Sequence, residues 1–143
     1  MITTAEEFIR LRRSEIPNEY KRAGCEEAPY EVWMEIIENH PKMRIWVARN
    51  RTITTELQTI LAKDKDFLVR YAIASKYPID RSLYEILSKD QEESVRLRII
   101  TNKKTPLDIL KTMANEDREE FIKEKAIAKY RERVEKESLG TRT

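Results

Sequence analysis

Two aspartates precede arginines at one spacing, and this arrangement has two chemical uses. Asp64 is followed six residues later by Arg70, and Asp90 six residues later by Arg96. A carboxylate near a helix start accepts main-chain N–H groups, and the guanidinium fork of arginine binds a carboxylate through two hydrogen bonds. The spacing therefore predicts a structural ladder of Asp64, Arg70, Asp90 and Arg96. The alternative is a stripe of arginines that binds phosphate, which requires arginines that are not already paired to carboxylates.

Nucleophiles and metal ligands are scarce in this sequence. His40, in the segment ENHPKM, is the single histidine, and Cys25 is the single cysteine. A lone histidine lacks the second base or ligand that catalysis or metal binding needs, and one cysteine forms no intrachain disulfide. With only Gly24 and Gly140, the chain also lacks a glycine-built phosphate loop. We therefore expect no catalytic residue, no metal, no cofactor and no enzymatic activity.

These residues belong to a unit that recurs every 26 residues. The segments LAKDKDFLVR and LSKDQEESVR begin 26 residues apart, at positions 61 and 87. A fixed period with the same chemistry at many offsets predicts a repeat array. The periodic apolar positions are Val47, Ile73 and Ile99, then Leu57, Leu83 and Ile109, then Leu61, Leu87 and Met113. A polar position follows the same period and holds Asn50, Lys76 and Asn102.

The apolar spacing within one unit is helical. It predicts a first helix over about 67–75 and a second over about 79–88, with Pro78 at the boundary. Asn50 and Asn102 fall between helices, where asparagine suits a helix cap or a left-handed residue that ends a helix. The four residues from Thr4 to Glu7 match a capping box and predict a helix over about 4–15.

These patterns predict an all-α protein that forms a single domain. Residues 1–28 are expected to form an N-terminal helical cap, 29–135 the repeat array, and 136–143 a flexible tail. Apolar residues make up 40% and charged residues 38% of the chain, which supplies a core beneath a highly charged surface.

The segments VRYAIASKYPIDRSLYEILSKD and VRLRIITNKKTPLDILKTMANE resemble the variant leucine-rich repeat, a relative of HEAT-type helical repeats. The resemblance covers roughly residues 29–131. It implies a right-handed α-solenoid (an α-α superhelix) of helix pairs, in which the Asp–Arg ladder ties neighbouring repeats together. Founding members carry a cysteine-rich iron–sulfur region, which Cys25 alone does not supply.

The resemblance also implies a function. Small bacterial proteins of this type often serve as protein-binding scaffolds, and some immunity proteins that neutralise a toxin look like helical repeats. The function expected from the resemblance is therefore non-catalytic protein binding, in its sharpest form the masking of a bacterial toxin domain. The alternative is a HEAT-like protein that binds nucleic acid.

The turns of a stacked array would line up along its edges, so their charges indicate possible partners. Turns from a second helix to the next first helix carry Asp64, Asp66, Asp90, Glu92, Glu93, Glu116 and Asp117. Turns from first to second helix carry Arg49, Arg51, Lys76, Lys103 and Lys104. An acidic edge would cover a cationic protein surface, and a basic edge would follow a phosphate backbone. Both sets are also compatible with ordinary solvated turns.

Two further features concern the binding surface and the location. Trp46, Tyr71 and Arg98 occupy nearby offsets in successive units and form a candidate partner-binding face, although Trp46 could equally pack on a neighbouring repeat. Trp33 is expected in the core. The net charge of +2 argues against strong nonspecific binding to nucleic acid. The sequence shows no signal-peptide pattern and no apolar run of the ~18 residues that span a membrane, which predicts a soluble, cytoplasmic protein without a membrane partner.

Overall fold

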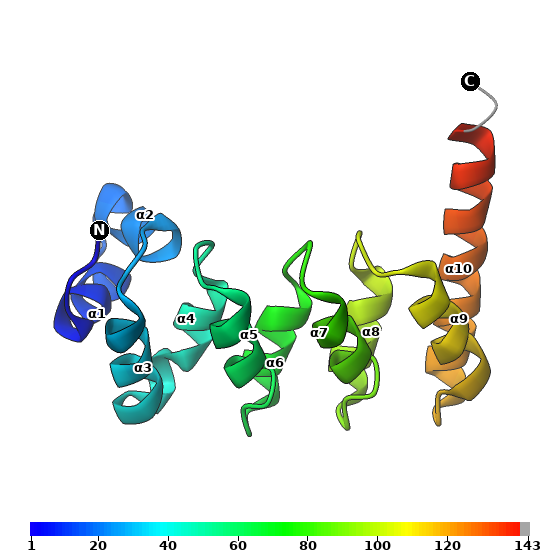
Figure 1. Cartoon of the computed structure of the whole chain (residues 1–143), viewed down its shortest axis with the longest axis horizontal. Coiled ribbons are helices and arrows are strands. Elements are labelled where there is room, and N and C mark those ends of the chain that lie inside the picture. The colour runs from blue at the N-terminus through cyan, green and yellow to red at the C-terminus, as the bar shows by residue number, and fades with distance from the viewer. Residues whose placement is uncertain (141–143) are drawn as a thin grey trace. The chain divides into compact units, whose positions relative to one another are not determined.

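The structure is a computed structural model that describes residues 1–140, and its regular elements are helices (Figure 1). No β-strand occurs among these residues, so the predicted all-α class is confirmed. The helices of the first half are α1 (Ala5–Arg13), α2 (Pro17–Cys25), α3 (Tyr30–Asn39), the 3-10 turn η1 (Pro41–Met43), α4 (Arg44–Arg49), α5 (Thr55–Leu61) and α6 (Phe67–Ala74). Those of the second half are α7 (Arg81–Leu87), α8 (Glu93–Thr101), α9 (Leu107–Glu116) and α10 (Glu120–Gly140).

The chain divides into two compact units, with the boundary between Ile73 and Ala74. The first unit contains α1 to α5 and most of α6, and the second contains α7 to α10. This boundary falls inside the segment 29–135, for which the sequence predicts one array. None of the helices in residues 1–140 is long and apolar enough to cross a membrane.

The N-terminal helices pack around buried aromatic rings. The Thr4 hydroxyl accepts a hydrogen bond from the Glu7 N–H at 3.0 Å, and the Glu7 carboxylate accepts from the Thr3 N–H at 3.0 Å. The capping box therefore forms, with Thr3 as the second donor. The rings of Phe8 and Trp33 meet edge to face with centroids 5.2 Å apart, and Trp33 is buried, as the sequence predicted.

The periodic apolar residues form the core of each unit. All of them are buried, and they come from both helices of the predicted pairs. The first-helix positions are Val47, Ile73 and Ile99, and the second-helix positions are Leu57, Leu61, Leu83, Leu87, Ile109 and Met113. The 26-residue period of apolar residues therefore marks the buried positions, because the equivalent face of each helix packs against the core.

The periodic asparagine is a buried hydrogen-bonding centre instead of a left-handed cap. Asn102 follows α8 with φ −66° and ψ 129°, an extended conformation. Its side-chain NH2 donates to the carbonyls of Ala74 and Lys76 at 2.8 and 2.7 Å. Its Oδ1 accepts from the Lys104 N–H and the Tyr84 hydroxyl, each at 3.0 Å. The amide satisfies both of its donors, and this explains why a polar residue recurs at a buried position.

Asn50 makes the equivalent bonds in the first unit. Its NH2 donates to the carbonyls of Ala23 and Glu26 at 2.8 and 3.0 Å, and its Oδ1 accepts from the Thr52 N–H at 2.8 Å. The carbonyl acceptors lie at the end of the preceding first helix or just after it. Asn50 and Asn102 thus each join their own turn to an earlier turn of the same unit.

The C-terminal end differs from the prediction of a flexible tail over 136–143. Helix α10 continues through residues 136–140. Glu132 pairs with Lys136 one helical turn later at 3.3 Å and with Lys129 one turn earlier at 3.6 Å. These i,i+3 and i,i+4 pairs and the good helix formers of this segment extend the helix beyond its packed part. Residues 141–143 lie outside the described part of the chain.

Candidate partner-binding site

The arginine of the predicted ladder is anchored by a main-chain carbonyl as well as by a carboxylate. The Arg96 guanidinium donates to the carbonyl of Asp90 at 2.8 Å. It also binds both carboxylate oxygens of Asp117, at 2.9 and 3.3 Å. The side chains of Arg96 and Asp117 are only 2% and 4% exposed. Arg96 and Asp117 therefore form a buried bidentate ion pair, and the Arg96 guanidinium also donates to a backbone carbonyl.

The ladder arginine of the first unit is also anchored by a main-chain carbonyl. Arg70 donates to the main-chain carbonyl of Asp64 at 2.7 Å, and the Asp64 carboxylate accepts from the Asp66 N–H at 2.9 Å. The Asp64 carboxylate also lies 3.5 Å from the guanidinium of Arg44. Arg70 and Arg96 thus each bond to the main-chain carbonyl of the aspartate six residues earlier. The sequence could not predict these bonds, because every residue has a main-chain carbonyl and the spacing of side chains does not show which carbonyl accepts.

Three residues of the predicted acidic edge are engaged within the protein. The side chains of Asp64 and Asp117 are nearly buried in their ion pairs, and Asp90 is buried with its carboxylate accepting from the Glu92 N–H at 2.9 Å. They hold the turns in shape and are not exposed to a partner. The acidic candidates that remain partly or fully exposed are Asp66, Glu92, Glu93 and Glu116.

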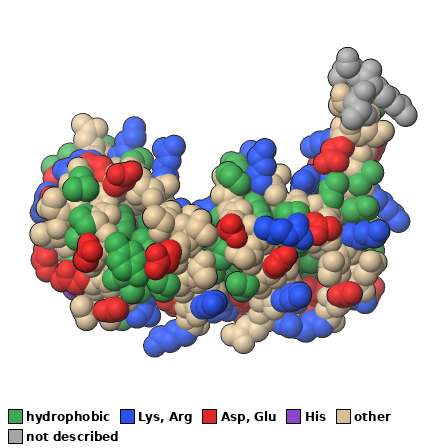
Figure 2. All heavy atoms as spheres, in the orientation of Figure 1, with side chains coloured by type: hydrophobic (Ala, Val, Ile, Leu, Met, Phe, Trp, Pro, Cys, Tyr) green, Lys and Arg blue, Asp and Glu red, His purple; other side chains and the backbone are tan. Residues whose placement is uncertain are grey.

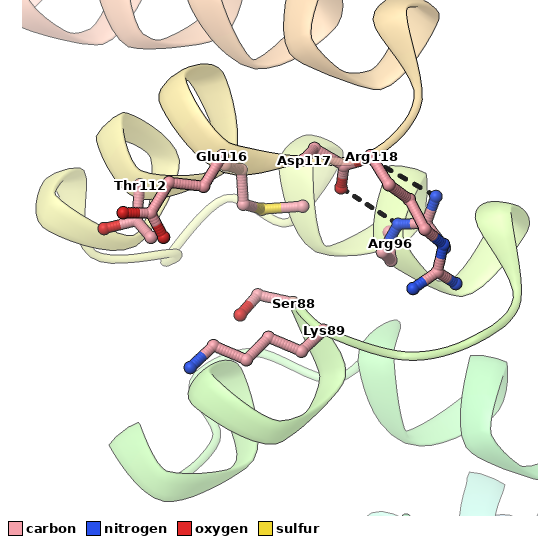
Figure 3. A pocket seen from close by; sticks show the side chains of 8 residues that line it. Ser88, Lys89, Arg96, Thr112, Glu116, Asp117 and Arg118 are labelled. Atoms are coloured by element: carbon pink, nitrogen blue, oxygen red, sulfur yellow. Dashed lines mark hydrogen bonds and ion pairs between the residues drawn. The ribbon is translucent and has the colours of Figure 1, made fainter.

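A cavity of about 260 Å³ lies between two of these turns in the second unit (Figure 3). Ser88 and Lys89 lie on one side of it, facing Thr112 and Glu116 on the other. Arg118 connects the two turns by donating to the carbonyls of Gln91 and Asp90 at 2.7 and 3.3 Å. The complete lining is Ser88, Lys89, Arg96, Thr112, Met113, Glu116, Asp117 and Arg118.

The arginines at this cavity have partners within the protein, whereas several glutamates of the neighbouring turns have no ion-pair partner. Arg96 and Arg118 are both bonded to the protein's own oxygens. By contrast, no ion pair within residues 1–140 involves the turn carboxylates, which belong to Glu93, Glu116, Glu119 and Glu120. Phe121, which follows Glu120, is 48% exposed. Acidic and basic side chains are interleaved on this unit (Figure 2), so its turns are not a uniformly negative ridge.

The basic turns contain aromatic partners that the sequence did not reveal fully. Lys103 lies over the ring of Tyr77, with its Nζ 5.4 Å from the ring centre. Arg49 lies over the ring of Trp46, with its guanidinium carbon 4.9 Å from the ring centre. Arg51 and Lys104, like Arg49 and Lys103, are exposed. Exposed cations thus occur in both units, and one in each unit, Arg49 and Lys103, is partly held by a neighbouring ring.

Lys76 differs from the other candidates on the basic turns. It occupies the periodic position that holds asparagine in the flanking repeats, and it is partly buried. Burial lowers the pKa of Lys76 from 10.5 to about 8, because the charged ammonium loses its hydration. Lys76 is therefore only partly charged near pH 8 and is a weak contributor to a basic edge.

We expect the amine of Lys76 to react with an acylating reagent with a pH midpoint near 8 in the folded protein. Peptide mapping by mass spectrometry across pH 6.5–10.5 measures this midpoint, and the protein in urea is the control, where the midpoint should move toward 10.5. The unfolded chain binds more protons between these two values, so this group makes stability rise with pH across that window. A folded-state midpoint above 10 would show that the amine is not desolvated.

Of the predicted partner-binding face, Trp46 and Tyr71 belong to the first unit and Arg98 to the second. Trp46 is partly buried beneath Arg12, whose guanidinium carbon lies 3.3 Å from the ring centre. Arg98 belongs to the second unit and donates to the hydroxyls of Ser75 and Thr101 at 2.9 and 3.1 Å. Tyr71 is 37% exposed in the first unit. Arg12 lies outside the repeat period, so no periodic signal in the sequence identified it.

The histidine and the cysteine lie at the ends of two different helices. His40 follows α3, and Cys25 is a free thiol at the end of α2, with the Arg51 guanidinium 4.0 Å from its sulfur. Within residues 1–140 there is no group of three or more His, Cys, Asp or Glu side chains arranged to hold a metal ion. Comparison of the chain with protein-family models, with curated proteins and with solved structures finds no match.

Proposed function

We propose that this chain is a non-catalytic protein-binding protein of the variant leucine-rich repeat type, in which successive helix pairs stack as a right-handed α-solenoid. The equivalent bonds of Asn50 and Asn102, two 26-residue periods apart, support the repeat. The partner would bind the acidic turns of the second unit, on either side of the cavity between them. The supporting observation is that Glu116 lines this cavity and that Glu116, Glu119 and Glu120, close together in the chain, are exposed and form no ion pair within residues 1–140.

The turns are well suited to a protein interface because they are already ordered. The buried pair of Arg96 and Asp117 and the bridge made by Arg118 fix both turns before any partner arrives. Binding then costs little conformational entropy at the interface. Phe121 offers an exposed aromatic anchor, and the glutamates offer a charged rim that attracts a cationic surface and speeds association.

The full chain used as bait in its native host should retain a protein with a basic surface. We expect the triple variant Glu116→Gln, Glu119→Gln and Phe121→Ser to reduce retention of that protein at least tenfold, a loss of about 1.4 kcal/mol or more in binding free energy. Quantitative mass spectrometry of the bound fraction measures the change. Association with the purified partner should also slow as salt is raised.

The matched control is an acidic surface elsewhere in the chain. Hydrophobic side chains bordered by acidic ones are visible around α3 (Figure 2), and the exposed residues there include Tyr30, Glu31 and Glu35. The double variant Glu31→Gln and Glu35→Gln should retain the partner fully. Equal retention by the triple variant and the wild type would contradict the proposed binding surface.

The partner expected from the resemblance is a bacterial toxin domain with a cationic active site, which the acidic turns would cover. A toxin domain encoded next to the gene of this protein would be the candidate partner, and mixing the two purified proteins should then abolish the toxin's activity. The alternative is nucleic-acid binding through Arg49, Arg51, Lys103 and Lys104, favoured by the ring-stacked cations of the basic turns. A DNA mobility shift at moderate salt with a steep salt dependence would favour that alternative over protein binding.

A further inference from the structure

The first unit contains a small basic pocket that is separate from the acidic turns. The cavity has a volume of about 140 Å³. Arg12 from α1, Tyr20 and Gly24 from α2, and Trp46 and Arg49 from α4 line it, together with Ala23. None of these lining residues is acidic, so Arg12 and Arg49 supply the only charged side chains of its lining.

Arg12 is held in a fixed orientation while one of its donors is unused. Its guanidinium carbon lies 3.3 Å from the ring centre of Trp46 and 4.6 Å from that of Tyr20. Cation–π attraction to both rings fixes the plane of the guanidinium. The Arg12 Nε is buried and has no hydrogen-bond partner. A buried N–H without an acceptor is costly, so the arrangement around Arg12 is not fully satisfied by the protein's own groups.

The second arginine brings a further positive charge to the same ring. The guanidinium carbon of Arg49 lies 4.9 Å from the ring centre of Trp46. Within residues 1–140 neither Arg12 nor Arg49 forms an ion pair. Two guanidinium groups on one ring repel each other, and a bound anion would replace that repulsion with two attractive interactions.

We propose that this pocket binds a small phosphate-type oxyanion, either free phosphate or pyrophosphate. The planar forks of two arginines match the paired oxygens of such an anion, and each charge-assisted bond is stronger than a neutral one. The faces of Trp46 and Tyr20 next to the pocket are covered by guanidinium groups, so these rings hold arginine instead of stacking a nucleobase. The cavity has the volume of about five water molecules at ~30 Å³ each, which suits a small anion.

Tryptophan fluorescence reports binding at this pocket directly. The sequence has two tryptophans, so Trp33→Phe leaves Trp46 as the single emitter. In this background, at constant ionic strength and pH 7.5, pyrophosphate and phosphate should give a saturable change in emission. Arg12→Lys should weaken binding at least tenfold because it removes the planar fork and the stacked guanidinium. Arg49→Gln should have an effect of similar size.

The matched control is Arg13→Gln, which removes an exposed arginine one residue along the same helix and should leave the affinity unchanged. Circular dichroism verifies that each variant keeps its helices. The proposal is overturned if emission changes in proportion to added salt without saturating, or if Arg12→Lys and Arg49→Gln bind as well as the parent. It is also overturned if a short oligothymidylate binds more tightly than pyrophosphate, because the site would then belong to a nucleic-acid surface.

Discussion

Replacing Asp117 with alanine should lower the free energy of unfolding by about 3–5 kcal/mol, because it leaves the Arg96 guanidinium buried without its counter-charge. The two side chains are 2% and 4% exposed, so both charges are largely shielded from water in the folded state. The Arg96 bonds to the carbonyls of Asp90 and Gln91 would remain, and they prevent the arginine from swinging out to solvent without further loss. Urea unfolding followed by circular dichroism measures the change.

An exposed ion pair in the same unit is the matched control. Arg81 pairs with Asp108, and their side chains are 54% and 63% exposed. Asp108→Ala should cost much less than Asp117→Ala, since exposed pairs are screened by water. The double variant Arg96→Met and Asp117→Leu should recover much of the stability lost in Asp117→Ala, because no buried charge remains. Equal losses for Asp117→Ala and Asp108→Ala would show that the Arg96 site is open to water.

Replacing Asn102 with alanine should also cost about 3–5 kcal/mol. The variant removes four hydrogen bonds and leaves the carbonyls of Ala74 and Lys76, the Lys104 N–H and the Tyr84 hydroxyl without their partner. Each unsatisfied buried group costs about 1–3 kcal/mol, and partial access of water reduces the sum. The measurement is again urea unfolding.

Two further variants make the Asn102 result interpretable even if the alanine variant does not fold. Tyr84→Phe removes one of the four bonds and should cost about 1 kcal/mol. Asn115→Ala replaces an exposed asparagine of α9 and should change stability by less than about 0.5 kcal/mol. If Asn102→Ala were as mild as Asn115→Ala, the periodic asparagine would not hold the turns together.

The sequence by itself determined the helical class and most of the core. A residue that packs inward in every helix pair must be apolar each time, so the 26-residue period identified Leu57, Leu83 and Ile109 as buried residues. The capping pattern likewise located the start of α1, because the bond between Thr4 and Glu7 is local in the chain. Local bonds and repeated burial both leave a pattern that can be recognised without coordinates.

The partners of the polar residues were decided by the tertiary structure alone. Arg96 could be predicted to need a carboxylate, but the choice of Asp117 over Asp90 depends on how two turns approach each other. The roles of Asn50 and Asn102 depend on main-chain carbonyls, which every residue has and no sequence pattern marks. The cluster of Arg12, Tyr20 and Trp46 joins α1 and α2, which lie outside the repeat period, to α4. Contacts between residues distant in the chain, and contacts to the backbone, depend on how the helices pack. The order of residue types leaves no local pattern from which that packing can be recognised.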